Sequence, residues 1–272
     1  MNFWDNFEKD KHLIIAHRGA RSIRAENTMS AFVQSLGKCD MVEFDVGFSR
    51  DGVAVIIHDD TLERTSDVRD HKEFKAPYNV VDYDYAQLLK LDFGSWFVKE
   101  DPFGTIKKDE GLKSELDKLD IQRILTLDEL LAFLKKNKMI ANIEIKDAKE
   151  TRFDEIAAKE VLKIVEKHNM KDMVCISSFN HEYLKQIHDL APDIEIAALQ
   201  EDHHPANLVE YLKGLHVKSY NPDFDITDET LVKKLNNAGF FVNVYTVNKR
   251  SDIEKLFNWG VKSVFTDFPQ EN

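Results

Sequence analysis

Three carboxylates on two apolar segments are the residues whose types and spacing most clearly indicate chemistry. Glu43 and Asp45 lie two positions apart in MVEFDV, and Glu144 lies in NIEIK. Because neighbouring side chains of a β-strand point to opposite faces, Glu43 and Asp45 must share one face. Carboxylate oxygens suit Mg²⁺ and Ca²⁺, so the three side chains predict a site for one divalent cation. The alternative is a buried acid pair neutralised by Arg or Lys.

Two cationic residues accompany these carboxylates. Lys146 shares a strand face with Glu144 and is placed to meet an anion. Arg18 follows His17 where the first apolar segment ends. Each cation also has a structural explanation, since Lys146 can form a salt bridge to a neighbouring acid and Arg18 can pair with an acid such as Asp267. The residues alone leave both interpretations open.

Two histidines complete the set. His17 precedes Gly19, which allows the backbone to turn sharply after a strand. His58 ends a strand-like run that begins at the turn Asp51-Gly52. Either histidine alone can be a satisfied core residue. Two histidines beside three carboxylates, an arginine and a lysine nevertheless supply what acid–base catalysis on a phosphate ester requires, namely proton carriers and charge neutralisation.

The elements that must position these residues are short apolar segments that recur along the whole chain. The strand-like segments are LIIAHR, MVEFDV, MIANIEIK, MVCISSF, IEIAAL, HVKSYN, FFVNVYTV and VKSVFTD. Segments with helical spacing separate most of them, with Asn27 or Thr28, Thr126, and Gly239 or Gly260 as boundary signals. Eight strand–helix repeats in 272 residues favour an α/β fold of the (β/α)₈ TIM barrel type over an open doubly wound sheet. Barrel chemistry belongs at the carboxyl ends of the strands.

One stretch interrupts this alternation. Residues 59–116 contain no clear strand–helix unit, and loops of this length in compact domains are usually functional. We interpret them as a lid-like insertion after the second barrel strand, within a single domain of residues 1–272. Phe93, Trp96 and Phe97 are expected to dock it onto the barrel mouth. A separately folding unit with no part in the site is the alternative.

Composition limits the partners of the chain. With 37 Lys+Arg against 49 Asp+Glu, a formal charge of −12 would repel nucleic acid or an anionic bilayer. Cys39 and Cys175 stand far apart, which gives little support to a disulfide or a zinc site. The opening residues lack the features of a signal peptide, and no apolar run is long enough to span a membrane. We therefore expect a cytoplasmic protein without stable membrane association, and the sequence does not indicate its oligomeric state.

Several motifs occur in an order that is specific to one family. From about Leu13 to Pro269 the chain carries HRGA, ENT, EFDV, DGVAVIIHDDTLERT, LTLDELL, NIEIK, SSF, VNVYTVN and GVKSVFTDFP. In these motifs and their spacing it resembles the glycerophosphodiester phosphodiesterase family. The resemblance implies a TIM barrel with an insertion after the second strand. It also implies metal-dependent hydrolysis of a glycerophosphodiester, a small-molecule substrate, to glycerol phosphate and an alcohol.

The resemblance also assigns roles residue by residue. It implies metal ligation by Glu43, Asp45 and Glu144, proton transfer by His17 and His58, and phosphate contact by Arg18 and Lys146. Tyr245 stands where the family often has Trp, so Phe179 and Tyr245 are candidates for the pocket of the alcohol group. Ala25 and Ile124 replace prolines that often occur in the family, and both changes affect only turns.

Three other functions are weighed against this one. The first is a phosphodiesterase of the lysophospholipase-D-like type, which an exposed apolar groove would mark. The second is a catalytically silent barrel that only binds phosphodiesters, although every catalytic position is filled. A metal-dependent sugar isomerase or aldolase would use similar carboxylates, but it explains neither the paired histidines nor HDDTLERT.

Overall fold

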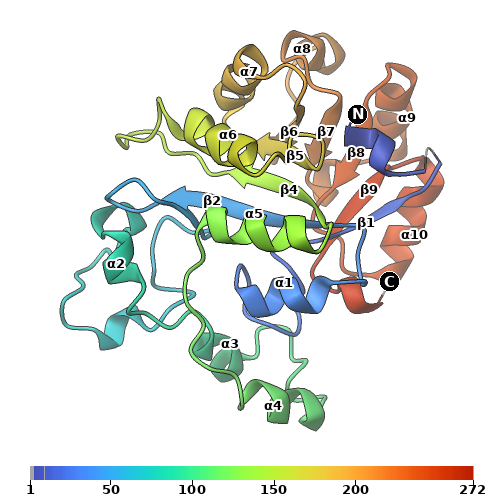
Figure 1. The fold of residues 1–272 in the computed structure, drawn as a ribbon. Coiled ribbons are helices and arrows are strands. Elements are labelled where there is room, and N and C mark those ends of the chain that lie inside the picture. The colour runs from blue at the N-terminus through green and yellow to red at the C-terminus, as the bar shows by residue number, and fades with distance from the viewer. Residues whose placement is uncertain (1–2, 9, 272) are drawn as a thin grey trace.

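A closed barrel of parallel strands forms the centre of the protein (Figure 1). The computed structural model describes residues 3–8 and 10–271. The strand order is β1-β9-β8-β7-β6-β5-β4-β2, and pairing of β1 with β2 closes the ring. These strands are β1 (Leu13–Ala16), β2 (Met41–Phe48), β4 (Ile140–Ile145), β5 (Val174–Ser178), β6 (Glu195–Gln200), β7 (Ser219–Pro222), β8 (Phe241–Val244) and β9 (Ser263–Thr266). The predicted (β/α)₈ fold is confirmed.

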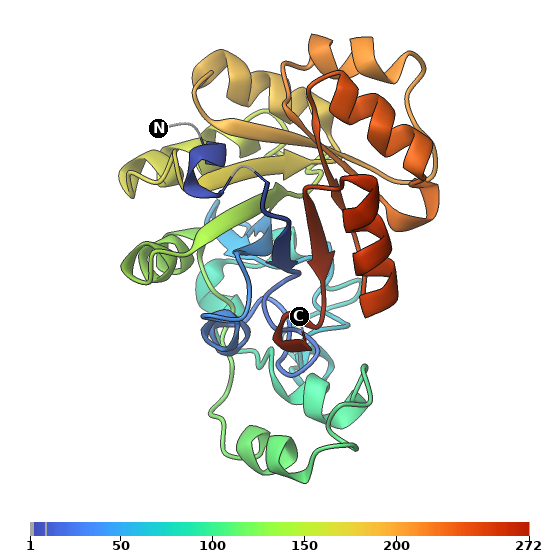
Figure 2. The ribbon, with the colours of Figure 1, turned by 90° about the vertical axis from the view of Figure 1, so that its right-hand side faces the viewer.

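Helices between the strands cover the outside of the barrel (Figures 1 and 2). They are α1 (Met29–Ser35), α5 (Leu127–Lys136), α6 (Ala157–Lys167), α7 (His181–Leu190), α8 (Leu208–Gly214), α9 (Glu229–Asn237) and α10 (Arg250–Trp259). Thr28, rather than Asn27, is the N-cap of α1, and Thr126 forms a capping box with Glu129 at the start of α5. Gly260 ends α10 in the left-handed conformation, which glycine adopts without steric cost.

The two faces of the strands have different surroundings. Val42, Phe44 and Val46 of β2 point outward into the main apolar core between barrel and helices. The alternate residues point into the barrel, where polar side chains bond across neighbouring strands. Asn142 donates to Ser177 Oγ at 2.8 Å in this interior. The alternation expected from the sequence therefore separates an apolar outer face from a partly polar inner one.

The amino-terminal segment closes the barrel at the end opposite the strand carboxyl termini. The 3-10 helix η1 (Phe3–Asn6) buries Phe3 beside Leu13 and Met41, which begin β1 and β2. Trp4 lies 4.4 Å from Phe241 between ring centroids. This aromatic plug leaves the carboxyl ends of the strands as the open mouth of the barrel.

The insertion lies to one side of the barrel and projects beyond it in both views (Figures 1 and 2). It follows β3 (Ala54–Ile56), which pairs antiparallel with β2. The elements that follow are the 3-10 helices η2 (Val68–Asp70) and η3 (Val80–Asp82) and the helices α2 (Tyr85–Leu88), α3 (Ser95–Glu100) and α4 (Glu110–Leu116). Two further 3-10 helices, η4 (Phe224–Ile226) and η5 (Pro269–Glu271), lie in the carboxyl-terminal half.

The three aromatic residues of the insertion do not act as one group. Trp96 and Phe97 share an apolar cluster with Ala25 of the β1–α1 loop. Phe93 packs instead in a separate cluster with Val55 of β3. The insertion thus has apolar contacts of its own as well as contacts to the barrel, and its action as a lid stays a prediction. None of the helices in residues 3–8 and 10–271 combines the length and apolarity needed to cross a bilayer.

Candidate active site

Strand register brings the three predicted carboxylates together. Asp45 of β2 is the register partner of Glu144 on β4, and Glu43 is the partner of Asn142. Paired residues of neighbouring strands point to the same face, so the acids converge inside the barrel near its mouth. One ligand atom from each of the three carboxylates lies within 4.8 Å of the other two. Glu43 and Asp45 are almost fully buried.

Hydrogen bonds satisfy only part of this acidic cluster. Glu43 Oε2 accepts from the Arg18 backbone N–H at 2.8 Å, and Asp45 Oδ2 accepts from Asn27 Nδ2 at 2.8 Å. Glu43 Oε1 and Asp45 Oδ1 are buried and accept no hydrogen bond from the part of the chain that the structure describes. Buried polar oxygens are normally paired. Two buried oxygens without a hydrogen bond, beside a third carboxylate, fit a divalent cation.

The electrostatics of the cluster agree with this fit. Burial raises the pKa of Glu43 well above its usual value, and Asp45 and Glu144 raise it further. Burial and Asp45 likewise raise the pKa of Glu144. Burial also opposes ionisation of Asp45, but the charges of Arg18 and Lys146 and the other stabilising partners together outweigh it and lower the pKa of that carboxyl. Packing three acids together is therefore unfavourable without more positive charge than Arg18 and Lys146 supply.

The two cations that the sequence singled out border the cluster. Arg18 Nε lies 3.3 Å from Asp45 Oδ2, and Arg18 Nη1 donates to Glu26 Oε1 at 2.9 Å. Lys146 Nζ lies 2.7 Å from Glu144 Oε1 and 3.9 Å from Asp45 Oδ1. The salt-bridge explanation for Lys146 thus coexists with its position on the site. Among the described residues, the salt bridges of Arg18 are to Glu26 and Asp45, so the predicted pair of Arg18 with Asp267 does not form.

Asp267 is instead the partner of His17. His17 Nδ1 lies 2.8 Å from Asp267 Oδ1, and Asn248 Nδ2 donates to the other carboxylate oxygen at 2.7 Å. Burial, reinforced by Arg18, lowers the pKa of His17 to about 4. The ring is therefore neutral near pH 7. With Nδ1–H donating to Asp267, its Nε2 is a free acceptor for a proton.

His58 has the same kind of support from the insertion side. It follows β3, and its Nδ1 lies 2.6 Å from Asp59 Oδ1. Arg64 then donates to both oxygens of Asp59, from Nε at 2.6 Å and from Nη2 at 2.9 Å. Both histidines thus have an aspartate at Nδ1, an arrangement that fixes the orientation of the ring.

Several polar residues around this site were not singled out from the sequence as site residues. Glu26 accepts from Arg18, Arg21 and Arg64, and Asn27 holds Asp45. Glu26 and Asn27 belong to ENT, and Arg64 belongs to HDDTLERT. The motifs marked the segments, but no periodicity indicates which of their polar residues face inward.

One cavity of about 570 Å³ joins these groups at the barrel mouth. Its lining includes both histidines, Glu43, Glu144, Arg18 and Lys146. Phe179 and Tyr245 also line it, with their rings in an edge-to-face contact at 6.0 Å. The Tyr245 hydroxyl donates to the Gln200 carbonyl oxygen at 2.9 Å, which ties the ring to β6. The nine predicted site residues therefore lie on or around a single cavity.

Comparison with known proteins places the chain in a family. A model of the "Glycerophosphoryl diester phosphodiesterase family" matches residues 17–271. This chain belongs to that family. The predicted resemblance is confirmed, and so is the prediction of an enzyme of the phosphodiesterase class.

Relatives of this phosphodiesterase family match over nearly their full length. A "Glycerophosphodiester phosphodiesterase" of Bacillus altitudinis is 32% identical over 263 residues, which cover 94% of each chain. A protein of the same name from Bacillus subtilis is 29% identical over 271 residues, or 96% of this chain and 85% of that one. A solved phosphodiesterase of Oleispira antarctica, in complex with the product sn-glycerol-3-phosphate, is 25% identical with a TM-score of 0.80. The match covers 100% of this chain and 97% of that structure.

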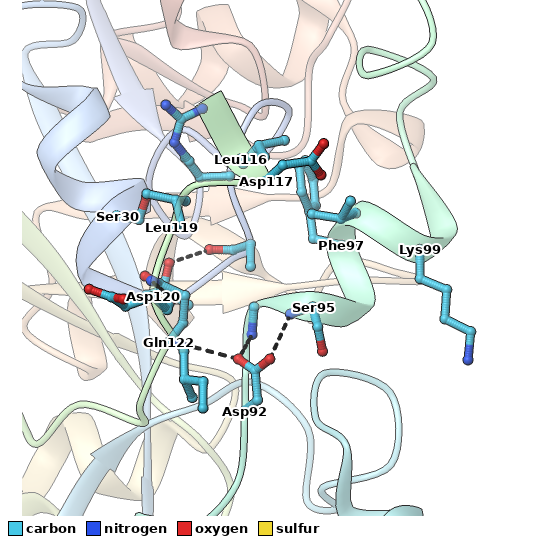
Figure 3. A pocket seen from close by; sticks show the side chains of 16 residues that line it. Ser30, Asp92, Ser95, Phe97, Lys99, Leu116, Asp117, Leu119, Asp120 and Gln122 are labelled. Carbon is cyan, nitrogen blue, oxygen red and sulfur yellow. Dashed lines mark hydrogen bonds between the residues drawn. The ribbon is translucent and has the colours of Figure 1, made fainter. Parts of the chain in front are cut away.

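A second cavity of this phosphodiesterase lies away from the acidic cluster (Figure 3). It measures about 360 Å³, lies between the β1–α1 loop, α3 and residues 116–122, and shares no lining residue with the mouth cavity. Figure 3 shows the Asp92 carboxylate directed at nearby backbone. It accepts from the N–H groups of Gly94, Ser95 and Gln122 at 2.9, 3.3 and 3.1 Å. Asp92 thus ties the start of α3 to the segment that precedes α5.

Proposed function

We propose that this chain hydrolyses glycerophosphodiesters to glycerol phosphate and a free alcohol. The observation that carries the proposal is that Glu43 Oε1 and Asp45 Oδ1 are buried without a hydrogen bond from the described residues, beside a cavity that Glu43, His17 and His58 line. Family membership supports the same reaction, as does the sn-glycerol-3-phosphate held by the Oleispira antarctica relative.

Glu43, Asp45 and Glu144 would hold one divalent cation, either Mg²⁺ or Ca²⁺. When bound, such an ion polarises phosphoryl oxygens and lowers the pKa of a coordinated hydroxyl or water. The protein contributes a cluster of oxygen ligands that its own cations only partly neutralise. A requirement for the ion follows from that remaining negative charge.

Arg18 and Lys146 would contact the phosphate and offset the charge that grows on it during cleavage. Both line the mouth cavity, and both are already held in place by carboxylates. Arg18 is fixed by Glu26 and Asp45, so it meets an anion without much loss of side-chain freedom. Phe179 and Tyr245 would border the alcohol group, with the centre of the Phe179 ring 5.9 Å from Lys146 Nζ.

His17 acts as the general base and His58 as the general acid in this proposal. His17 is neutral at pH 7 and orients Nδ1 toward Asp267, so Nε2 can take a proton from the attacking hydroxyl. His58 returns a proton to the departing alcohol oxygen. The phosphorus–oxygen bond to that alcohol breaks as the new bond forms. Attack by water leaves glycerol phosphate directly, whereas attack by a hydroxyl of the glycerol moiety leaves a cyclic phosphodiester that a water molecule then opens to glycerol phosphate.

The test is release of glycerol phosphate from glycerophosphocholine by metal-stripped protein, before and after addition of Mg²⁺ or Ca²⁺. We expect activity only with an ion, and a loss of roughly 10²–10⁴-fold in turnover for His17→Ala and for His58→Ala. Arg250→Ala is a matched control, since that guanidinium is exposed on α10 and pairs with Glu254. Near-normal turnover in both histidine variants would contradict the assignment.

A further inference from the structure

One unbroken series of polar contacts links the two histidines from behind the site. On the barrel side, Asp267 bonds His17, and Arg21 Nη1 lies 3.3 Å from Asp267 Oδ1. Arg21 Nη2 then donates to Glu26 Oε2 at 2.8 Å. The residues of the series come from the β1–α1 loop, the end of β9 and the insertion, so they meet only in the folded protein.

Arg64 joins the insertion to this barrel network. Its guanidinium donates to both oxygens of Glu26, at 3.0 and 2.7 Å, and to both oxygens of Asp59, at 2.6 and 2.9 Å. A planar guanidinium that is bidentate on both sides fixes the relative position of its two partners. Asp59 in turn holds His58 Nδ1. Arg64 also lies 5.9 Å from the centre of the Trp96 ring on α3.

The positive charges around Glu26 and Asp59 keep both carboxylates ionised. Burial opposes ionisation of Glu26, but the hydrogen bond from Arg64 and the charges of Arg18 and Arg21 lower its pKa well below the usual value. Burial likewise opposes ionisation of Asp59, and bonds from His58 and Arg64 lower its pKa. Glu26 is only 5% exposed, so its position is set by these partners rather than by water.

We propose that Arg64 is a positioning residue: by clamping Asp59 to Glu26, it aims His58 at the departing alcohol. The proposal rests on the proposed function, in which His58 protonates that alcohol. Arg64 makes no contact with the phosphate in this role. Glu26 is the fixed point of the clamp, because the same carboxylate is bound to Arg18 on the phosphate side and to Arg21 on the His17 side.

Two substrates separate this role from a general structural one. Choline is a poor leaving group that needs a proton, whereas p-nitrophenol departs as a stable anion. Arg64→Met should lower kcat on glycerophosphocholine by roughly 10–10²-fold. This loss is smaller than that expected for His58→Ala, because the acid is still present but less well oriented. It should change kcat on the p-nitrophenyl ester of glycerol phosphate by less than about threefold. Arg64→Lys keeps the charge without the bidentate geometry, so it should fall between Arg64→Met and the wild type.

Matched variants complete the experiment. Arg69→Met is the control, since that arginine lies in the same insertion, pairs with Glu63 and has a side chain that is 72% exposed. The double variant His58→Ala with Arg64→Met should be no slower on glycerophosphocholine than His58→Ala alone, because Arg64 acts through His58. That non-additivity, together with dependence on the leaving group, would support the clamp.

Three results would overturn it. Equal loss on both substrates, or additive losses in the double variant, would mean that Arg64 supports the fold in general. Wild-type kcat on glycerophosphocholine in Arg64→Met would mean that His58 needs no clamp. If the wild-type protein with Mg²⁺ or Ca²⁺ cleaved neither substrate, the proposed function itself would fail, and the two failures are therefore distinguishable.

Discussion

Replacing Glu43 with glutamine should stabilise the metal-free protein and abolish its response to a divalent cation. Glutamine keeps the shape of the side chain and an oxygen that can accept from the Arg18 backbone N–H. It removes a buried charge whose pKa is raised by burial and by Asp45 and Glu144. Its amide N–H₂ replaces Oε1, the oxygen without a hydrogen-bond donor among the described residues, and can donate to a neighbouring carboxylate.

The size of the effect follows from these groups. An unsatisfied buried polar group costs about 1–3 kcal/mol, so Glu43→Gln should raise the free energy of unfolding of the metal-free protein by about that amount. For chains of 150–250 residues, 1 kcal/mol corresponds to about 2–4 °C in Tm. A cation at 100 times its Kd adds about 2.7 kcal/mol to the wild type, or roughly 5–10 °C, and should add almost nothing to the variant.

Thermal unfolding of metal-stripped protein, with and without Mg²⁺ or Ca²⁺, measures both effects. Glu195→Gln is the matched control, because Glu195 is also a buried carboxylate of the barrel whose pKa is raised by burial. Ser219 Oγ donates to the Glu195 carboxylate at 2.8 Å, and Glu195 is the first residue of β6, at the end of the strand away from the barrel mouth. If metal-free Glu43→Gln were less stable than the wild type and still gained the full increment from the cation, the acidic cluster would not be the ion site.

Two further predictions concern stability. The pKa of His17 is about 4 in the folded protein and 6.5 in the unfolded chain, so the unfolded chain binds a proton between these pH values and the folded protein does not. The free energy of unfolding of the wild type should therefore fall by up to about 3 kcal/mol as the pH drops from 6.5 to 4. Urea unfolding across that range should show a smaller slope for His17→Gln. Gly19→Ala should cost more than about 1 kcal/mol, because φ is +81° and a Cβ would lie 2.8 Å from Ala31 Cβ. Gly37→Ala, with φ +71° but open space around it, should cost less in the same assay.

The barrel was predictable from the sequence because its signal is local and repeated. Alternation in MVEFDV assigned Val42 and Phe44 to one face and Glu43 and Asp45 to the other, and the structure has that division. Caps such as Thr126 were readable for the same reason, since a capping box spans four consecutive residues. The insertion was recognisable only as an interruption, because its short helices and β3 depend on contacts among distant residues.

The cluster of acids was partly predictable. A shared strand face follows from spacing for Glu43 and Asp45, but the approach of Glu144 depends on the register of β2 with β4. The partners of the histidines were not predictable in this way. Asp267 stands 250 residues from His17, and no local pattern links the two.

The sequence by itself determined the alternation of strand and helix, the face on which each strand residue lies, and the ordered motifs that identify the family. Those features depend on neighbouring residues or on single residue types, so they can be recognised in the sequence without a structure. Only the tertiary structure decided that the Glu26 carboxylate accepts hydrogen bonds from three arginines. It also decided that Arg64 joins Asp59 to Glu26 and that Asp267 is bonded to His17 Nδ1. The reason is that long polar side chains reach any of several charged neighbours, and only packing of the β1–α1 loop against the insertion selects among them.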